Sequence, residues 1–539
     1  MKASDLFIHI LEQKGVKVIY GVPGEENLDL IDSLRKSGKI KLILTRNEQT
    51  AVFMAATYGR LTGEVGVAIA TLGPGATNMV TGVAFAQLGG FPVMVITGQK
   101  PIKKSKQGQF QIIDVVSMMK PITKYATTII SGNKIPHILH NAFKIATSER
   151  PGAVAVELPE DIAGEFVENP ELIISNEKVR RPIIDEKSIL ILKEELQKAK
   201  SPIILIGAGA NRKRITKYLT EFIVKYNIPF FTSQMGKGVV SEDLKEYLGT
   251  AALTSGDYIH NAIKESDLIL SVGYDPIEKP THLILEGGTK NIHINFYESN
   301  IDTVYNPYIE IIGDIGNTFW QLCETDIDNS NWDFEKIFKI KQKNIKLLQE
   351  NLENEDMGNN IIGPRQLVND VRSILQKDDI VALDNGLYKI WFARNYITYF
   401  PNTLLLDNAL ATMGAGVASG MEAKRINPLK NVVVITGDGG LVMNLGDLET
   451  VVRLKLDLTI IVLNNGSYGM IKWKQTGANM PEWGLDFGNP DFVKLAESFG
   501  GIGYKVENKN DFKKTLQKAN DEKGLKIIDL KFEYPNEIN

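Results

Sequence analysis

The chain has 539 residues, too many for one hydrophobic core, so we expect several domains. Its formal net charge of −4 is small for this length and gives no reason to expect binding to nucleic acid or to anionic membranes. A single cysteine, Cys323, excludes an internal disulfide framework and cysteine-clustered metal sites. Because the sequence has neither a signal-peptide core nor a membrane-length apolar stretch, it predicts a cytoplasmic protein.

Three blocks alternate short apolar strands with helix-length segments, the pattern of a parallel sheet covered by helices. They span residues 1–165, 188–325 and 362–539. The predicted strands lie in VKVIYGVPG, KLILT, VGVAIATLGPG and PVMVITG; then in PIILIGAGA, PFFTSQMGKG, DLILSVGYD, NIHINFY and YIEIIGD; and finally in DIVALDNG, TLLLDN, NVVVITGDGG, LTIIVLNNG and KIIDLKFEY. We therefore predict an α/β protein with three doubly wound parallel-sheet domains, the first and third built on one plan.

Charged, turn-rich segments connect the blocks at residues 165–188 and 326–360. The second connection carries Phe, Ile and Leu at helical spacing within a mostly polar sequence. It predicts an exposed helix between the second and third blocks.

The stretch ITGDGGLVM sets Asp438 between glycines at the end of an apolar strand. A helical stretch is expected from about Asn444, followed by the strand LTIIVL and the pair Asn464–Asn465. A strand–helix–strand unit of this kind places its two strands parallel in one sheet. Asp438 and the asparagine pair should therefore meet at the carboxyl edge, where open α/β sheets bind ligands.

A carboxylate, an amide oxygen and a nearby backbone carbonyl form a small all-oxygen set that suits Mg²⁺ completed by phosphate and water. Gly437, Gly439 and Gly440 allow backbone N–H groups to approach a diphosphate, and the following helix start favours negative charge. A helix cap followed by an ordinary turn is the alternative interpretation.

The spacing between GDG and NN resembles the diphosphate-binding signature of thiamine-diphosphate (ThDP) enzymes. The resemblance implies that the metal ligands are Asp438, Asn465 and the carbonyl of Ser467. Such enzymes also need a glutamate from another domain to hydrogen-bond the cofactor's aminopyrimidine, and Glu48 in TRNEQTAVF matches that position. Stabilisation of a helix dipole is the alternative role for Glu48.

The segments GVPGEENLDLI, ATLGPGATN, GQFQIIDVV, KPITKYA, RPGAVAVELPEDI, GYDPIEKPTHL and LDFGNPDFVKLAESFG resemble the acetolactate synthase family, in particular its catabolic, flavin-independent branch. The resemblance implies further site residues. It puts Gln111 near the reacting centre, Phe110 in the pocket wall, Lys124 beside the substrate channel, Met413 under the bent cofactor, and the backbone of Gly386, Leu387 and Tyr388 against the diphosphate. Each of these side chains could instead have an ordinary structural role.

The family resemblance implies a ThDP- and Mg²⁺-dependent carboligase that joins two pyruvates into 2-acetolactate and releases CO₂. FAD is not expected, although the glycine signal in IGAGA is too short to decide. Because Glu48 and Asp438 belong to different subunits in this family, we expect a homodimer or homotetramer with shared active sites.

Other functions stay open at this point. They are another ThDP enzyme acting on a 2-oxo acid (a flavin-containing acetohydroxyacid synthase, a pyruvate oxidase or an acetyltransferase) and a non-catalytic ThDP binder. A nicotinamide dehydrogenase is disfavoured, because no G-x-G-x-x-G follows a strand with an acid about twenty residues further on.

Overall fold

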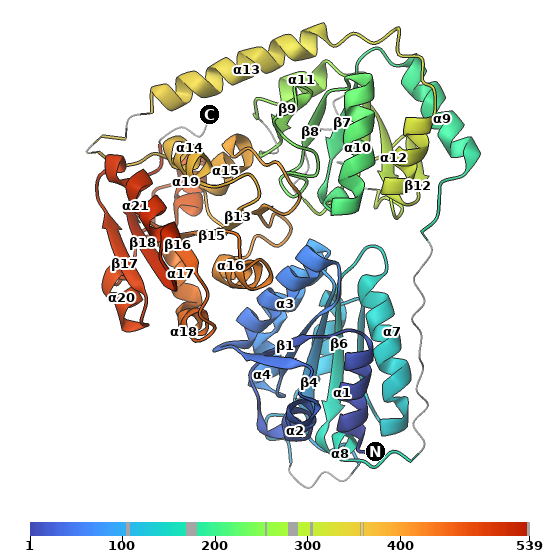
Figure 1. The fold of residues 1–539 in the computed structure, drawn as a ribbon, viewed down its shortest axis with the longest axis vertical. Coiled ribbons are helices and arrows are strands. Elements are labelled where there is room, and N and C mark those ends of the chain that lie inside the picture. Colours follow the sequence, from blue (N-terminus) through green and yellow to red (C-terminus); the bar gives the residue numbers. More distant parts are fainter. Residues whose placement is uncertain are drawn as a thin grey trace.

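The fold is known from a computed structural model. The structure describes residues 1–103, 108–168, 181–253, 256–278, 289–301, 305–355, 357–358 and 360–535. These residues form three six-stranded sheets whose strand pairs are all parallel, each sheet flanked by helices (Figure 1). The predicted α/β class is confirmed. Among the described residues, no helix is both long enough and apolar enough to cross a bilayer.

The first sheet has the strand order β2-β1-β3-β4-β6-β5. Its strands are β1 (Val18–Gly21), β2 (Lys41–Leu44), β3 (Gly66–Ala70), β4 (Val93–Gln99), β5 (Tyr125–Thr128) and β6 (Ala153–Pro159). Its main helices are α1 (Ala3–Gln13), α2 (Leu28–Ser37), α3 (Glu48–Thr62), α4 (Pro74–Asn78), α5 (Val80–Gly89), α6 (Val115–Met119), α7 (Ile135–Thr147) and α8 (Glu160–Ala163).

The third sheet repeats that order as β14-β13-β15-β16-β18-β17, so the predicted likeness of the two domains is confirmed. Its strands are β13 (Ile380–Leu383), β14 (Leu404–Leu405), β15 (Val432–Gly437), β16 (Leu458–Asn464), β17 (Ile502–Val506) and β18 (Leu525–Lys531). Its helices are α14 (Pro364–Ile374), α15 (Lys389–Asn395), α16 (Ala415–Ile426), α17 (Asp438–Met443), η5 (Leu445–Asp447), α18 (Leu448–Arg453), α19 (Gly469–Gly477), α20 (Phe492–Ser498) and α21 (Lys509–Asp521).

The central sheet has a different order, β12-β11-β10-β7-β8-β9. Its strands are β7 (Pro202–Ile206), β8 (Phe230–Thr232), β9 (Tyr247–Thr250), β10 (Leu268–Val272), β11 (Lys290–Asn295) and β12 (Ile309–Ile312). Helices α9 (Glu186–Lys198), α10 (Lys213–Tyr226), α11 (His260–Lys264) and α12 (Ile315–Glu324) accompany it. The order reverses between β10 and β7, as in doubly wound nucleotide-binding sheets.

The first and third domains share one hydrophobic core, which also takes in Met235 and Ala252 of the central domain. The first domain has a second core on its other face, and the central domain has a core of its own. Helix α3 packs directly against α16. At their contact the Thr57 hydroxyl of α3 donates to the Ser419 Oγ of α16 over 3.1 Å. The Tyr20 hydroxyl donates to buried Glu422 over 2.6 Å across the same junction. The two domains therefore form one packed unit.

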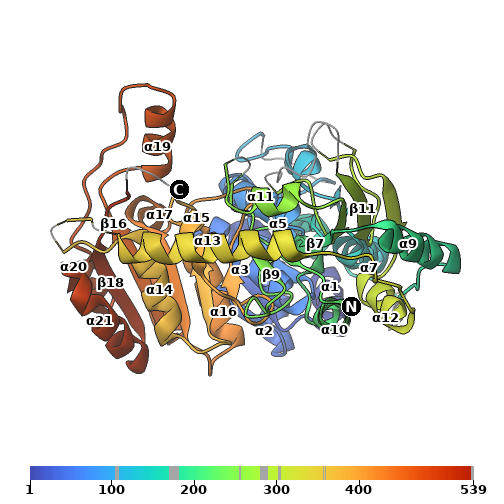
Figure 2. The same cartoon turned by 90° about the horizontal axis from the view of Figure 1, so that it is seen from above.

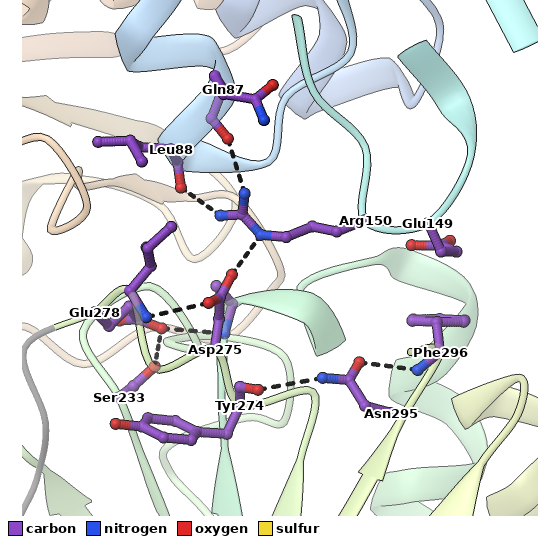
Figure 3. A network of polar contacts seen from close by, with 12 residues as sticks. Gln87, Leu88, Glu149, Arg150, Ser233, Tyr274, Asp275, Glu278, Asn295 and Phe296 are labelled. Atoms are coloured by element: carbon purple, nitrogen blue, oxygen red, sulfur yellow. Dashed lines mark hydrogen bonds and ion pairs between the residues drawn. The ribbon is translucent and has the colours of Figure 1, made fainter. Parts of the chain in front are cut away.

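A second junction joins the first and central domains around Arg150 (Figure 3). The Arg150 guanidinium donates to the carbonyls of Gln87 (2.7 Å) and Leu88 at the end of α5 and forms an ion pair with Asp275. Close by, buried Glu278 accepts a hydrogen bond from the Ser233 hydroxyl over 2.7 Å, and burial raises its pKa to about 7. Charge complementarity, rather than a shared core, holds this junction.

The predicted exposed helix between the second and third blocks is α13 (Glu335–Glu353), of which only Ile337 and Asn344 are buried. It runs along the outside of the molecule from the central to the third domain (Figure 2) and contacts α11 and α14. Residues 169–180 of the predicted first connection lie outside the described residues.

The predicted strands match observed ones but leave out β5, β6, β9 and β17. Three of these four lie at sheet edges, where short, partly polar strands give a weak apolar signal. A helical stretch does begin near Asn444, as η5 and α18. The sequence analysis misses the short helix α17 that precedes it and ends at Met443. The next residue, Asn444, donates its side-chain amide to the Gly414 carbonyl over 2.9 Å.

Candidate active site

Asp438 joins the two loops that the sequence analysis expects to meet. It is 2% exposed and stands directly after β15. Its Oδ1 accepts the Gly439 N–H over 2.8 Å, and its Oδ2 accepts the N–H groups of Asn465 (2.9 Å) and Gly466 (2.6 Å). The structure thus brings the GDG loop and the NN loop together through one carboxylate.

Further oxygen atoms gather around this carboxylate. Asn489, which the sequence analysis misses, donates its amide to Asp438 Oδ2 (2.8 Å) and to Asn464 Oδ1 (2.9 Å). Its own Oδ1 and the Ser467 Oγ are buried and find no partner among the described residues. Buried oxygens without donors, beside a carboxylate, fit a hard cation such as Mg²⁺.

Two glycines of the GDG loop are required by close packing. A Cβ on Gly440 would lie 2.1 Å from Asp384 Oδ2, and a Cβ on Gly439 would lie 2.9 Å from the Tyr468 ring. Any side chain at Gly440 would displace a buried carboxylate. These positions leave the backbone bare at the carboxyl edge of β15, as a diphosphate-binding loop requires.

Asp384, a second residue that the sequence analysis misses, ties three segments of the site together. It is 1% exposed and accepts N–H groups of Gly414 (3.0 Å) and Gly416 (3.4 Å) and the Thr436 hydroxyl (3.0 Å). Burial raises the pKa of this carboxyl, while these hydrogen bonds oppose the shift. Its position at a strand end, in VALDNG, is the one sequence signal that could have identified it.

Two other predicted cofactor segments lie beside the GDG loop. The Tyr388 ring lies 3.8 Å from the position of a Cβ on Gly437, so Gly386, Leu387 and Tyr388 border that loop. Half-buried Met413 precedes Gly414, where a Cβ would lie 3.5 Å from the Gly440 carbonyl oxygen. The structure therefore brings both segments to the Asp438 edge.

Glu48 is the first residue of α3 and is half-buried. Asn47 caps the helix, its Oδ1 accepting the Gln49 N–H over 2.8 Å. Asn78, at the end of α4, donates its amide to Glu48 Oε2 over 2.9 Å. The other oxygen, Oε1, accepts no hydrogen bond from the described residues, so the carboxylate is oriented yet still able to bind a further partner.

The remaining predicted residues fall at two different edges of the first sheet. Gln111 has a φ of +59°, and its carbonyl lies 2.9 Å from the position of a Cβ on Gly73, beside the start of α4. Its neighbour Phe110 is 69% exposed. Lys124 instead precedes β5 at the amino edge, where its ammonium donates to the carbonyls of Ser148 and Arg150, both at 2.7 Å. Within one chain, Lys124 is not brought to the Glu48 edge.

Glu48 and Asp438 are not joined by a hydrogen bond within the described part of the chain. The Arg46 N–H donates to Asp447 over 2.8 Å, so the loop before Glu48 contacts η5 rather than α17. Among the described residues, no hydrogen bond or ion pair joins Glu48 to the Asp438 loop. Apolar side chains near both edges are exposed; they are Phe110, Val442, Met443, Ile471, Met480 and Trp483. Helix α19 stands away from the body of the molecule (Figure 2).

Comparisons with protein families match three parts of the chain. Residues 1–118 match the N-terminal TPP binding domain of thiamine pyrophosphate enzymes, residues 191–322 match the central domain, and residues 384–530 match the C-terminal TPP binding domain. The Glu48 edge thus belongs to the first matched domain and the Asp438 edge to the third.

Full-length relatives are also found. An acetolactate synthase of Bacillus subtilis is 31% identical over 100% of this chain and 94% of its own length. A probable acetolactate synthase large subunit of Methanocaldococcus jannaschii is 32% identical over 96% of this chain and 90% of its own. A catabolic acetolactate synthase of Raoultella terrigena is 29% identical over 98% and 95%, respectively.

Proposed function

The chain belongs to the acetolactate synthase family of thiamine pyrophosphate enzymes, and on that premise we propose that it condenses two pyruvate molecules into 2-acetolactate. In the balanced reaction, two pyruvate anions and a proton give a 2-acetolactate anion and CO₂. The observation that carries this proposal is the similarity to acetolactate synthases along the whole chain, including one named as catabolic.

The residues around Asp438 would hold the cofactor's diphosphate through Mg²⁺. The proposed ligands are Asp438, the Asn465 side-chain oxygen and the Ser467 carbonyl, and Gly437, Gly439 and Gly440 leave room for the phosphates. The buried, unpartnered oxygens of Ser467 and Asn489 support a cation at this place. When bound, thiamine diphosphate supplies the electron sink for decarboxylation of a 2-oxo acid.

Glu48 is the proposed proton-handling group. A carboxylate held by Asn78 through one oxygen keeps its other oxygen for a hydrogen bond to the aminopyrimidine ring. Gln111 and Phe110, on the loop beside Gly73, are proposed to orient the second 2-oxo acid and to keep water away from it. Met413, beside the GDG loop, would pack against the cofactor and hold it in its bent form.

We further propose that two copies of the chain share each active site. Within the described part of one chain no hydrogen bond joins Glu48 to Asp438, and exposed apolar side chains lie near both edges. Burial of such side chains against a second copy would remove apolar surface from water. Mixing Glu48→Gln chains with Asp438→Asn chains tests this arrangement. Hybrid dimers would regain activity from sites that combine two intact residues, whereas a site formed within one chain would gain none.

The proposed reaction is tested by incubating the purified protein with pyruvate, ThDP and Mg²⁺ and identifying the product. We expect 2-acetolactate and CO₂. Acetaldehyde or acetyl phosphate as the main product would instead indicate a decarboxylase or an oxidase-type enzyme. A visible absorption spectrum of the same sample tests the expectation that FAD is not bound, since an oxidised flavin absorbs visible light and the polypeptide does not.

A further inference from the structure

A polar cavity of about 190 Å³ lies at the amino edge of the third sheet, the edge opposite Asp438. It borders the first residues of β15, β16 and β18, the end of α16 and the end of α21. The proposed chemistry uses none of the residues that line it. The question is what these residues, in this cavity, are suited to bind.

Two buried lysines line this amino-edge cavity. Lys424 is 7% exposed and Lys526 is 1% exposed. The Lys526 ammonium donates to the carbonyls of Glu522 (2.9 Å) and Gly524 (3.0 Å), and the Lys424 ammonium to those of Pro428 (3.1 Å) and Lys430 (2.8 Å). An ammonium group has three N–H donors, so each lysine has one N–H left that can donate to a ligand.

Neither lysine has an ion-pair partner among the described residues. Burial lowers the pKa of both groups, that of Lys526 to about 8. An unpaired cation inside a protein is costly, and a nearby anion would offset that cost. The charge of Asp457 opposes this lowering of the pKa in both lysines, although it forms no ion pair with either, so the cavity holds two desolvated ammonium groups that are only partly offset.

Three acids line the cavity, Asp457, Asp521 and Glu522, and among the described residues none of them forms an ion pair with Lys424 or Lys526. Asp457 already accepts the Lys523 ammonium (3.1 Å) and the Gly524 N–H (2.8 Å). Glu522 accepts the Tyr504 hydroxyl at the protein surface, and Asp521 is exposed. Lys523, whose side chain is 90% exposed, is paired with Asp457 and therefore adds no net positive charge at the mouth of the cavity.

A neutral donor completes the arrangement. Asn520, the penultimate residue of α21, accepts the Thr459 hydroxyl with its Oδ1 over 3.0 Å. In this orientation of the amide its Nδ2 is the free end, and this nitrogen is buried without an acceptor among the described residues. A buried N–H₂ group without a partner costs free energy unless a ligand or water accepts from it.

We propose that the amino-edge cavity is a binding site for a small oxyanion, a phosphate or a carboxylate, held by Lys424, Lys526 and Asn520. Charge-assisted hydrogen bonds from the two ammonium groups would fix the anion, and the Asn520 amide would donate a third bond. The volume suits a small molecule rather than a nucleotide or a peptide. This site is independent of the proposed carboligase reaction.

The test is a calorimetric titration of the holoenzyme, saturated with ThDP and Mg²⁺, with inorganic phosphate at ionic strength held constant by chloride. A parallel titration with acetate distinguishes a phosphate site from a carboxylate site. We expect saturable binding of one of the two anions to wild-type protein. Lys526→Gln and Lys424→Gln should each weaken it at least about tenfold, as expected when a charge-assisted hydrogen bond is lost.

Lys514→Gln is the matched control. Lys514 is exposed on α21, the helix that carries Asn520, and the variant loses one positive charge, as the two test variants do. It should leave the affinity unchanged. If Lys526→Gln does not fold, Asn520→Ala carries the test, with an expected loss of several-fold. No saturable binding to wild-type protein, or equal binding to all the variants, would overturn the proposal.

Discussion

The first and third domains have the same strand order but place their chemistry at different points of it. In the first domain the carboxylate Glu48 follows β2 and begins α3. In the third domain the matching strand, β14, leads through Met413 into α16, and the carboxylate Asp438 follows the next strand, β15. The shared fold therefore provides a carboxyl edge in each sheet, and the loops at that edge determine what it can bind.

The two carboxylates also differ in how many donors they already hold. Asp438 is buried and accepts four hydrogen bonds, from Gly439, Asn465, Gly466 and Asn489. Half-buried Glu48 accepts only the one from Asn78 among the described residues. We infer that Asp438 organises a fixed site and that Glu48 remains available for proton exchange.

The largest expected effect is that of Glu48→Gln. Loss of a general acid–base group should lower the turnover of pyruvate by about 10²–10⁴-fold. ThDP affinity should change little, because the amide keeps the shape of the side chain and still accepts from Asn78. Stopped-flow or steady-state assays, combined with ThDP titration by protein fluorescence, separate the two quantities. Turnover close to that of wild type would contradict the inference that Glu48, unlike Asp438, takes part in proton exchange.

Asp438→Asn should act on binding rather than on turnover. An amide lacks the charge that holds a cation, and its nitrogen cannot accept the N–H groups of Asn465 and Gly466. We expect the half-saturating Mg²⁺ concentration to rise about 10–100-fold, with activity recovering in excess Mg²⁺ and ThDP. Activity that is lost at every cofactor concentration, with binding unchanged, would assign Asp438 the role proposed for Glu48.

Asp384→Asn tests whether the loops at the carboxyl edge of the third sheet depend on the hydrogen bonds that buried Asp384 accepts. One of the donors from Gly414, Gly416 or Thr436 would lose its acceptor, at a cost of about 1–3 kcal/mol. We expect a lower melting temperature and weaker ThDP binding. The control is Asp378→Asn, since Asp378 is exposed and its ion pair with Lys430 is a surface contact. Equal melting temperatures for both variants would show that Asp384 does not stabilise these loops.

The smallest effect should come from Asn78→Ala. The variant removes the single hydrogen bond that orients Glu48, worth about 0.5–1.5 kcal/mol, and should lower turnover roughly 2–10-fold. Because the hydrogen bond acts on the carboxylate and not on the diphosphate site, ThDP affinity should stay close to that of wild type. Unchanged turnover together with normal stability would mean that the cofactor alone orients Glu48.

Much of the fold could be predicted because buried parallel strands such as VVVIT and LTIIVL are continuous apolar runs. The meeting of Asp438 with Asn465 was also predictable, since two strands of one crossover end at one edge. The support provided by Asp384 and Asn489 was not, because both are far from Asp438 in sequence and lie in ordinary-looking loops. Lys124 matches the motif of a family site residue, yet it lies at the amino edge of the first sheet. A local motif does not indicate at which edge of a sheet a lysine lies.

The core shared by the first and third domains has a consequence for how the protein can be divided. Residues from both domains cover one another's apolar faces along α3 and α16, so neither domain alone would have a complete interior. A fragment that ends before the third domain should expose that face and precipitate or be degraded. The central domain, with a separate core, should tolerate excision and survive limited proteolysis as a folded piece.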